Sequence, residues 1–124
     1  MRIGILREEK IPSDERVVLT PKQCKWITEN TNIDLLVKSS DIRCFPDSDY
    51  SNLGIEVVKN LSDCDVLLGV KEVLKQSLIS DKVYFYFSHT IKEQSYNREL
   101  LQEMVQKNIT MIDYEVLKDK NNKR

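Results

Sequence analysis

Short apolar runs alternate with polar and amphipathic stretches along the whole chain. Six of these runs have the length and the residue types of β-strands. They cover residues 2–6, 33–38, 55–58, 65–70, 82–88 and 109–114. Several central runs are apolar without a clean alternation of polar positions, which is typical of parallel strands covered on both faces.

A helix is predicted between the first two strands. Thr20 is a good N-cap residue and Pro21 suits the first helical position, so the helix is expected to begin there within residues 17–30. The side chains expected to face inward are Cys24, Ile27 and Trp26.

Other helical patterns follow later in the chain. Residues 95–108 place four apolar side chains on one helical face: Leu100, Leu101, Met104 and Val105. Residues 46–54 are expected to form a short helix or turn closed by Gly54, and residues 72–79 one or two helical turns. Strands alternating with helices predict right-handed crossovers and a three-layer α/β domain.

Polar and ionisable residues follow four of the predicted strands. These strand ends carry Arg7 and Glu8, Lys71 and Glu72, Ser88 and His89, and Tyr114 and Glu115. In open parallel sheets, ligands bind beyond the carboxyl ends of the strands. The four strand ends therefore predict one polar site at one edge of the sheet.

A lysine, a histidine and nearby carboxylates make a set suited to acid–base chemistry. His89 is the only histidine, and imidazole titrates near neutral pH. Lys71 can act as a second proton carrier when it is partly removed from water. Arg16, on the loop before the first helix, can clamp a substrate carboxylate with its planar fork.

Each of these residues also has a plainer interpretation. His89 can be a surface or capping residue, and Lys71 a solvated strand end. Arg16 can pair with Asp14 or Glu15. The aromatic run of residues 84–87 is interpreted as core and not as a platform for stacking nucleobases.

Composition narrows the class of protein. The 124 residues suffice for one domain, 40% are hydrophobic and 31% are charged, and the formal net charge is −1. A chain with this charge balance is not expected to bind nucleic acid or an anionic membrane. No apolar run reaches the length of a membrane span and no signal peptide is evident, so a cytoplasmic location is expected.

Two kinds of site are not expected in this sequence. Cys24, Cys44 and Cys64 are widely spaced, and one histidine does not complete a typical zinc site with them, so they are interpreted as buried or half-buried thiols. Three glycines without a G-x-G-x-x-G motif give no nucleotide-binding fingerprint.

Three ordered motifs carry a family resemblance over essentially the whole chain. "LREEKIPSDERVVLTP", "LLGVKEV" and "FYFSHTIKEQ" resemble signature stretches of the alanine dehydrogenase and pyridine nucleotide transhydrogenase N-terminal domain family. "FSHTIKEQ" and "IDYEVLKDKNNKR" are more similar to its lysine-pathway branch, which holds saccharopine dehydrogenase (lysine-forming) and lysine-ketoglutarate reductase.

The resemblance implies a flavodoxin-like parallel sheet with helices on both faces. It implies a substrate-side domain at 1–117 and a polar tail at 118–124 leading to a Rossmann domain of the same polypeptide, which would bind NAD or NADP. Substrates would be an amino acid and an oxo acid, lying between the domains. This chain alone is then expected to lack hydride transfer, and the sequence leaves oligomer formation open.

The resemblance also implies roles for seven residues. Lys71 and His89 fall on the catalytic lysine and histidine, and the substrate-binding positions fall on Arg16, Lys92 and Arg124. Glu72 and Glu115 fall on carboxylates that tune the pKa values of the catalytic pair. Two alternatives stay open at this point: an alanine dehydrogenase-type enzyme, and a stand-alone binding module without catalysis.

Overall fold

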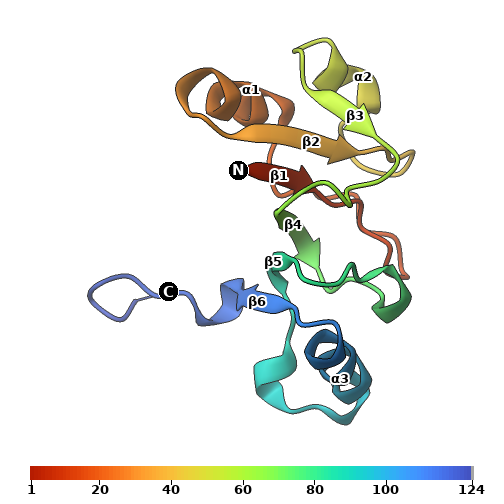
Figure 1. The fold of residues 1–124 in the computed structure, drawn as a ribbon, viewed down its shortest axis with the longest axis vertical. Coiled ribbons are helices and arrows are strands. Elements are labelled where there is room, and N and C mark those ends of the chain that lie inside the picture. Colours follow the sequence, from red (N-terminus) through yellow and green to blue (C-terminus); the bar gives the residue numbers. More distant parts are fainter. Residues whose placement is uncertain (124) are drawn as a thin grey trace.

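Six parallel strands form one twisted sheet in the computed structural model, which describes residues 1–123. The strands are β1 (Arg2–Ile5), β2 (Asp34–Lys38), β3 (Glu56–Val58), β4 (Val66–Lys71), β5 (Val83–Phe87) and β6 (Thr110–Asp113). Their order in the sheet is β3-β2-β1-β4-β5-β6, and every neighbouring pair is parallel (Figure 1). All six predicted strands are confirmed, as is the parallel α/β class.

Three α-helices join the strands: α1 (Pro21–Asn30), α2 (Asp47–Ser51) and α3 (Arg98–Gln106). Thr20 caps α1 as predicted, because its side chain accepts the Gln23 N–H while the Gln23 side chain bonds the Thr20 N–H. Residues 72–79 hold a single 3₁₀ turn, Lys75–Ser77. Three further 3₁₀ turns are Thr90–Lys92, Ser95–Asn97 and Tyr114–Val116.

The helices lie on opposite faces of the sheet. α1 and α2 pack Cys24 and Tyr50 against Ile5, Leu35 and Val37 on one face. On the other face, Leu100 and Met104 of α3 pack on a row that includes Leu36, Leu67 and Tyr84. Gly4 lies in this row, and an added Cβ would sit 2.8 Å from the Leu67 Cδ2 atom. The absence of a side chain therefore lets the second face pack closely over β1.

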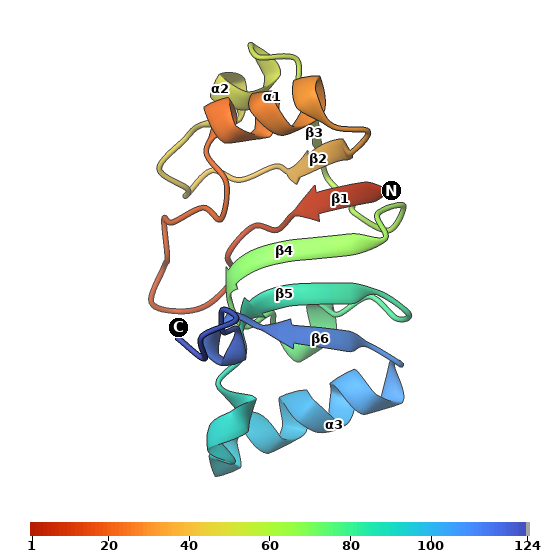
Figure 2. The ribbon, with the colours of Figure 1, turned by 90° about the vertical axis from the view of Figure 1, so that its left-hand side faces the viewer.

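The strand order differs from that of flavodoxin. Flavodoxin-like sheets follow the order 2-1-3-4-5, whereas this sheet follows 3-2-1-4-5-6 and changes direction between β1 and β4. Ligands of open α/β sheets bind where the direction changes, beyond the carboxyl ends of the strands. Figure 2 shows the long loop between β1 and α1 lying at that end of the sheet.

The predicted burial of Trp26 and of Cys44 was wrong. Trp26 is 62% exposed, because it lies two residues from the buried Cys24 and so points to the opposite side of α1. Cys44 is exposed, while Cys24 and Cys64 are buried as expected. None of the helices within residues 1–123 has the length and apolar character needed to cross a membrane.

Candidate functional site

A hollow of about 220 Å³ opens at the carboxyl ends of β4 and β5. Its lining consists of Arg16, Val70, Lys71, Phe87 and His89. Arg16, Lys71 and His89 thus surround one cavity, although they come from three separate segments of the sequence. The first two carry cationic side chains and the third an imidazole. The structure brings them together as the strand-end argument predicted, and their chemical roles stay predictions.

Lys71 owes its place to a buried carboxylate. At the carboxyl end of β4, the neighbouring strand β1 has already ended. The register between β4 and β5 also shifts between Leu68 and Lys71. Two backbone N–H groups of β4 therefore need acceptors from outside the sheet. Glu8 supplies both, because its carboxylate oxygens accept from Val70 N at 2.8 Å and Lys71 N at 2.9 Å. Burial raises the pKa of Glu8, and the two backbone hydrogen bonds oppose that rise.

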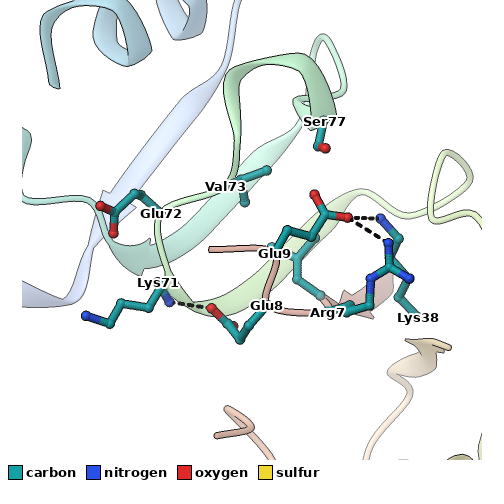
Figure 3. Close-up of a pocket in the computed structure, with 9 residues that line it drawn as sticks. Arg7, Glu8, Glu9, Lys38, Lys71, Glu72, Val73 and Ser77 are labelled. Atoms are coloured by element: carbon teal, nitrogen blue, oxygen red, sulfur yellow. Dashed lines mark hydrogen bonds and ion pairs between the residues drawn. The ribbon is translucent and has the colours of Figure 1, made fainter. Parts of the chain in front are cut away.

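Figure 3 shows the Glu8 carboxylate bonded to the Lys71 backbone while the Lys71 side chain runs away from a second, smaller cavity. That cavity has about 10 Å³, close to the space that one water occupies. Beside it, the Glu9 carboxylate accepts from Arg7 and from Lys38. The pKa of Glu9 is lowered: burial opposes the shift, and hydrogen bonds from Ser77, Lys38 and Arg7 outweigh it.

Glu72 is paired with Lys10, a residue that the sequence argument did not consider. The Lys10 ammonium group bonds one Glu72 oxygen, and the other oxygen is buried without a partner among residues 1–123. Burial lowers the pKa of Lys10, and the charge of Lys71 lowers it further. Two ammonium groups and one carboxylate therefore lie near each other at the end of β4, and the tuning role of Glu72 stays a prediction.

His89, the second residue after β5, is held in the left-handed backbone region with φ of 56°. Its Nδ1 atom lies 3.2 Å from Glu115 Oε2, and Lys92 Nζ lies 2.8 Å from Glu115 Oε1. The pKa of Glu115 is lowered, chiefly by its hydrogen bond with Lys92. Burial opposes this shift, and the hydrogen bond with His89 adds to it. The structure thus joins three predicted site residues, His89, Lys92 and Glu115, in one ionic cluster.

A buried hydrogen-bond network lies under this cluster. Ser88 Oγ donates to Asp113 Oδ2 at 2.5 Å, and Asp113 Oδ1 accepts from Glu115 N at 2.8 Å. Asn97 Nδ2 donates to the His89 carbonyl at 3.3 Å. The ends of β5 and β6 are therefore fastened to each other next to the hollow.

Arg16 forms the ion pair that its plainer interpretation predicted, with Asp14 and not with Glu15. Its Nε and Nη2 atoms lie 2.9 and 2.6 Å from the two Asp14 oxygens. This bidentate contact lowers the pKa of Asp14 to about 2. The Arg16 side chain is still 61% exposed, so the guanidinium is oriented at the rim of the hollow without being buried.

The aromatic run of β5 divides into two kinds of position. Tyr84 and Tyr86 are fully buried beneath α3, as predicted. Phe87 is 39% exposed, so its assignment to the core was wrong. It stands at the strand end, where its ring meets Tyr114 edge to face at 5.2 Å and forms an apolar wall of the hollow.

Two further points concern ligands. Arg124, predicted to bind substrate, lies outside the described residues. No group of three metal-ligating side chains is found within residues 1–123. The described site places the ammonium group of Lys71, the imidazole of His89 and the guanidinium of Arg16 on one hollow.

Sequence reasoning missed the residues that hold this site in place. Glu8 was noted at a strand end without a role, and Ser88, Asn97 and Asp113 were given none. Asp113 carried the clearest signal, since an acidic residue closes the apolar run "ITMI". A charged residue in a buried strand requires partners, although the sequence does not name them.

Fold and site together define a class: a parallel α/β domain with a lysine–histidine–arginine site at its carboxyl edge. The family described as alanine dehydrogenase/PNT, N-terminal domain, matches residues 4–124. The chain belongs to this family.

Three enzymes are among the similar proteins. Alpha-aminoadipic semialdehyde synthase of Arabidopsis thaliana is 32% identical over 98% of this chain, which spans 12% of that protein. Saccharopine dehydrogenase [NAD(+), L-lysine-forming] of Yarrowia lipolytica is 27% identical over 96% of the chain and 33% of that protein. The structure of an L-alanine dehydrogenase superposes with a TM-score of 0.80 and 25% identity, covering 98% of this chain and 34% of the other. The chain therefore spans about a third or less of the length of these relatives.

Replacing Glu8 by Gln tests the support of Lys71. A glutamine has one oxygen, so either Val70 N or Lys71 N loses its acceptor, and we expect a loss of about 1–3 kcal/mol in the free energy of unfolding. Urea unfolding measures the loss, and faster hydrogen exchange at these two amides locates it. The matched change Glu56→Gln, on an exposed position of β3, should alter neither. Wild-type stability and exchange in Glu8→Gln would contradict the assignment.

Asp14→Asn tests the ion pair with Arg16. The folded pKa of about 2 lies below the ordinary value, so the pair stabilises the fold fully above about pH 4 and loses this effect as pH falls toward 2. We expect wild type to exceed Asp14→Asn in stability at neutral pH and to converge with it near pH 2, as read from urea midpoints. A gap that does not change with pH would count against the pair.

Proposed function

We propose that this chain is the substrate-side domain of an NAD(P)-dependent oxidoreductase that acts on the CH–NH bond of an amino acid. Among reactions of this kind, the names of its relatives favour the interconversion of saccharopine with lysine and 2-oxoglutarate. One observation carries the proposal: Arg16, Lys71 and His89 surround one hollow at the carboxyl ends of β4 and β5, next to the point where the strand order changes direction. The names of the saccharopine dehydrogenase and semialdehyde synthase relatives support the substrate class.

The geometry suits the proton transfers of such a reaction. Forming and hydrolysing an imine requires protons to be added to and removed from nitrogen and oxygen in turn, and Lys71 and His89 are two carriers on one cavity. Arg16 would bind a substrate carboxylate at the rim, and Lys92, which is 47% exposed, a second one. Glu115 would adjust His89 through their direct contact.

Hydride transfer would need a cofactor that another part of the polypeptide binds. The sequence has no glycine-rich nucleotide fingerprint, and the relatives are three times as long or longer. A dinucleotide-binding domain would close over the hollow and place the NAD(H) or NADP(H) ring beside the substrate. In this proposal the chain by itself binds substrate without oxidising it.

A second enzyme function is favoured by one comparison. The alanine dehydrogenase structure has the same fold and 25% identity to this chain. Its reaction would use a smaller substrate with a single carboxylate, and Lys92 would then have no substrate to bind.

Turnover in the complete protein that carries this chain separates the two enzymes. We expect oxidation of NADH or NADPH with lysine plus 2-oxoglutarate and none with pyruvate plus ammonia, because Arg16 in the hollow and Lys92, which contacts His89 and Glu115, are two cationic side chains suited to carboxylates. Absorbance of the reduced nicotinamide measures both. The reverse preference would replace the leading proposal with the alanine dehydrogenase-type reaction.

Lys71→Met and His89→Gln test the proton carriers in the same complete protein. Each variant should lose about 10²–10⁴-fold in kcat, since that is the usual contribution of one general acid or base. Lys59→Met, an exposed lysine away from the hollow, is the matched control and should keep wild-type turnover. Both site residues lie at an accessible edge, so unfolding midpoints should stay unchanged, and wild-type rates in both variants would refute their roles.

A further inference from the structure

We infer that Asp113 is a positioning residue that, together with Ser88, fixes the tautomer of His89 through Glu115 and leaves Nε2 as the nitrogen that exchanges protons with a ligand. The functional half of this inference rests on the proposed function. The structural half concerns which ring nitrogen bears hydrogen, and it can be measured without turnover.

The contacts of the imidazole ring decide the tautomer. Glu115 Oε2 lies 3.2 Å from Nδ1, and its carboxylate only accepts hydrogen bonds at neutral pH, because its pKa is lowered by Lys92 and His89. Nδ1 must therefore carry the hydrogen. The Lys92 ammonium group also lies 3.4 Å from Nδ1, but it is closer to Glu115 Oε1, at 2.8 Å. An ammonium group only donates hydrogen bonds, so it forms none with a protonated Nδ1 and bonds Glu115 instead.

Nε2 is left for other chemistry. His89 lines the hollow, and Nε2 has no hydrogen-bond partner in the part of the chain that the structure describes. With Nδ1 protonated, the lone pair of the neutral ring is on Nε2. This arrangement makes Nε2 a proton acceptor that faces no competition from the protein.

Asp113 holds Glu115 at the distance that this tautomer needs. Asp113 is buried, with 7% of its surface exposed, and its carboxylate uses both oxygens: Oδ2 accepts from Ser88 Oγ at 2.5 Å and Oδ1 from Glu115 N at 2.8 Å. Ser88 directly precedes His89, and Asp113 lies two residues before Glu115. One buried carboxylate therefore fixes the backbone on both sides of the His89–Glu115 contact.

Ser88 is committed to the same network. It is fully buried, and its single hydroxyl hydrogen is donated to Asp113, so it accepts from Thr90 Oγ1 at 2.8 Å and Thr90 N at 3.2 Å. Asn97 anchors the His89 carbonyl from the other side. These bonds hold His89 in its left-handed conformation, which a non-glycine residue keeps only when its surroundings determine it.

Asp113→Asn is the direct test, read from nitrogen NMR of the 15N-labelled chain. His89 is the only histidine, so one imidazole gives the whole signal. At a pH where the ring is neutral, we expect wild type to show hydrogen on Nδ1 and not on Nε2. Asparagine has one oxygen for two donors, so the variant should shift toward the tautomer mixture of free imidazole.

Three further variants complete the experiment. Ser88→Ala and Glu115→Ala should give the same shift, and they decide the matter if Asp113→Asn does not fold. Asp119→Asn is the matched control, because Asp119 accepts backbone N–H groups in the exposed tail, and it should keep the wild-type spectrum. Hydrogen on Nε2 in wild type, or unchanged tautomers in folded Asp113→Asn, Ser88→Ala and Glu115→Ala, would overturn the inference.

The tautomer result and the turnover result are independent. Turnover of lysine with 2-oxoglutarate by a protein whose His89 carries hydrogen on Nε2 would overturn this inference and leave the proposed function. An Nδ1-protonated ring in a protein that turns over neither substrate set would overturn the proposed function and leave the positioning role of Asp113.

Discussion

Two buried carboxylates hold the carboxyl edge of this sheet together. Glu8 accepts the two amides at the end of β4, and Asp113 accepts one hydroxyl from the end of β5 and one amide that follows β6. A buried donor without an acceptor costs about 1–3 kcal/mol, so neither strand end is free to move away from its carboxylate. Lys71 and His89 stand directly on these fastened strand ends.

The distribution of buried polar groups follows from this constraint. Within residues 1–123, the buried polar residues are Glu8, Ser40, Ser88, Asn97 and Asp113. Ser40 belongs to a separate loop, and the other four all bond backbone or side chains next to Lys71 or His89. A polar network in the interior is costly unless every member has a partner. Here the network is concentrated beside Lys71 and His89.

Three carboxylates near the hollow each contact one or two basic side chains. Asp14 pairs with Arg16, Glu72 pairs with Lys10, and Glu115 contacts both Lys92 and His89. Lys71 alone of the predicted site cations has no ion pair within the described chain, and its neighbour Lys10 has a lowered pKa partly because of the Lys71 charge. An unpaired ammonium group on a cavity is available to a substrate, which supports the proposed chemistry.

The extent of correct prediction differed between fold and site. All six strands and the cap at Thr20 followed from local pattern, because apolar runs and capping residues act within a few positions of themselves. Trp26 and Phe87 were misplaced because burial depends on which face of an element meets a neighbour. The strand order also lay beyond local pattern, since β4 joins β1 and not β3, the strand at the other free edge of the β3-β2-β1 sheet.

The sequence by itself determined the elements, their parallel arrangement and the set of strand-end groups, since each depends on residues close together in the chain. Only the tertiary structure decided which side chains bond one another. Lys10 meets Glu72 across 62 positions, and Ser88 meets Asp113 across 25. Such contacts depend on strand order and register, which are fixed when distant apolar faces pack together. The charges of the site were therefore readable from the sequence, whereas their pairing was not.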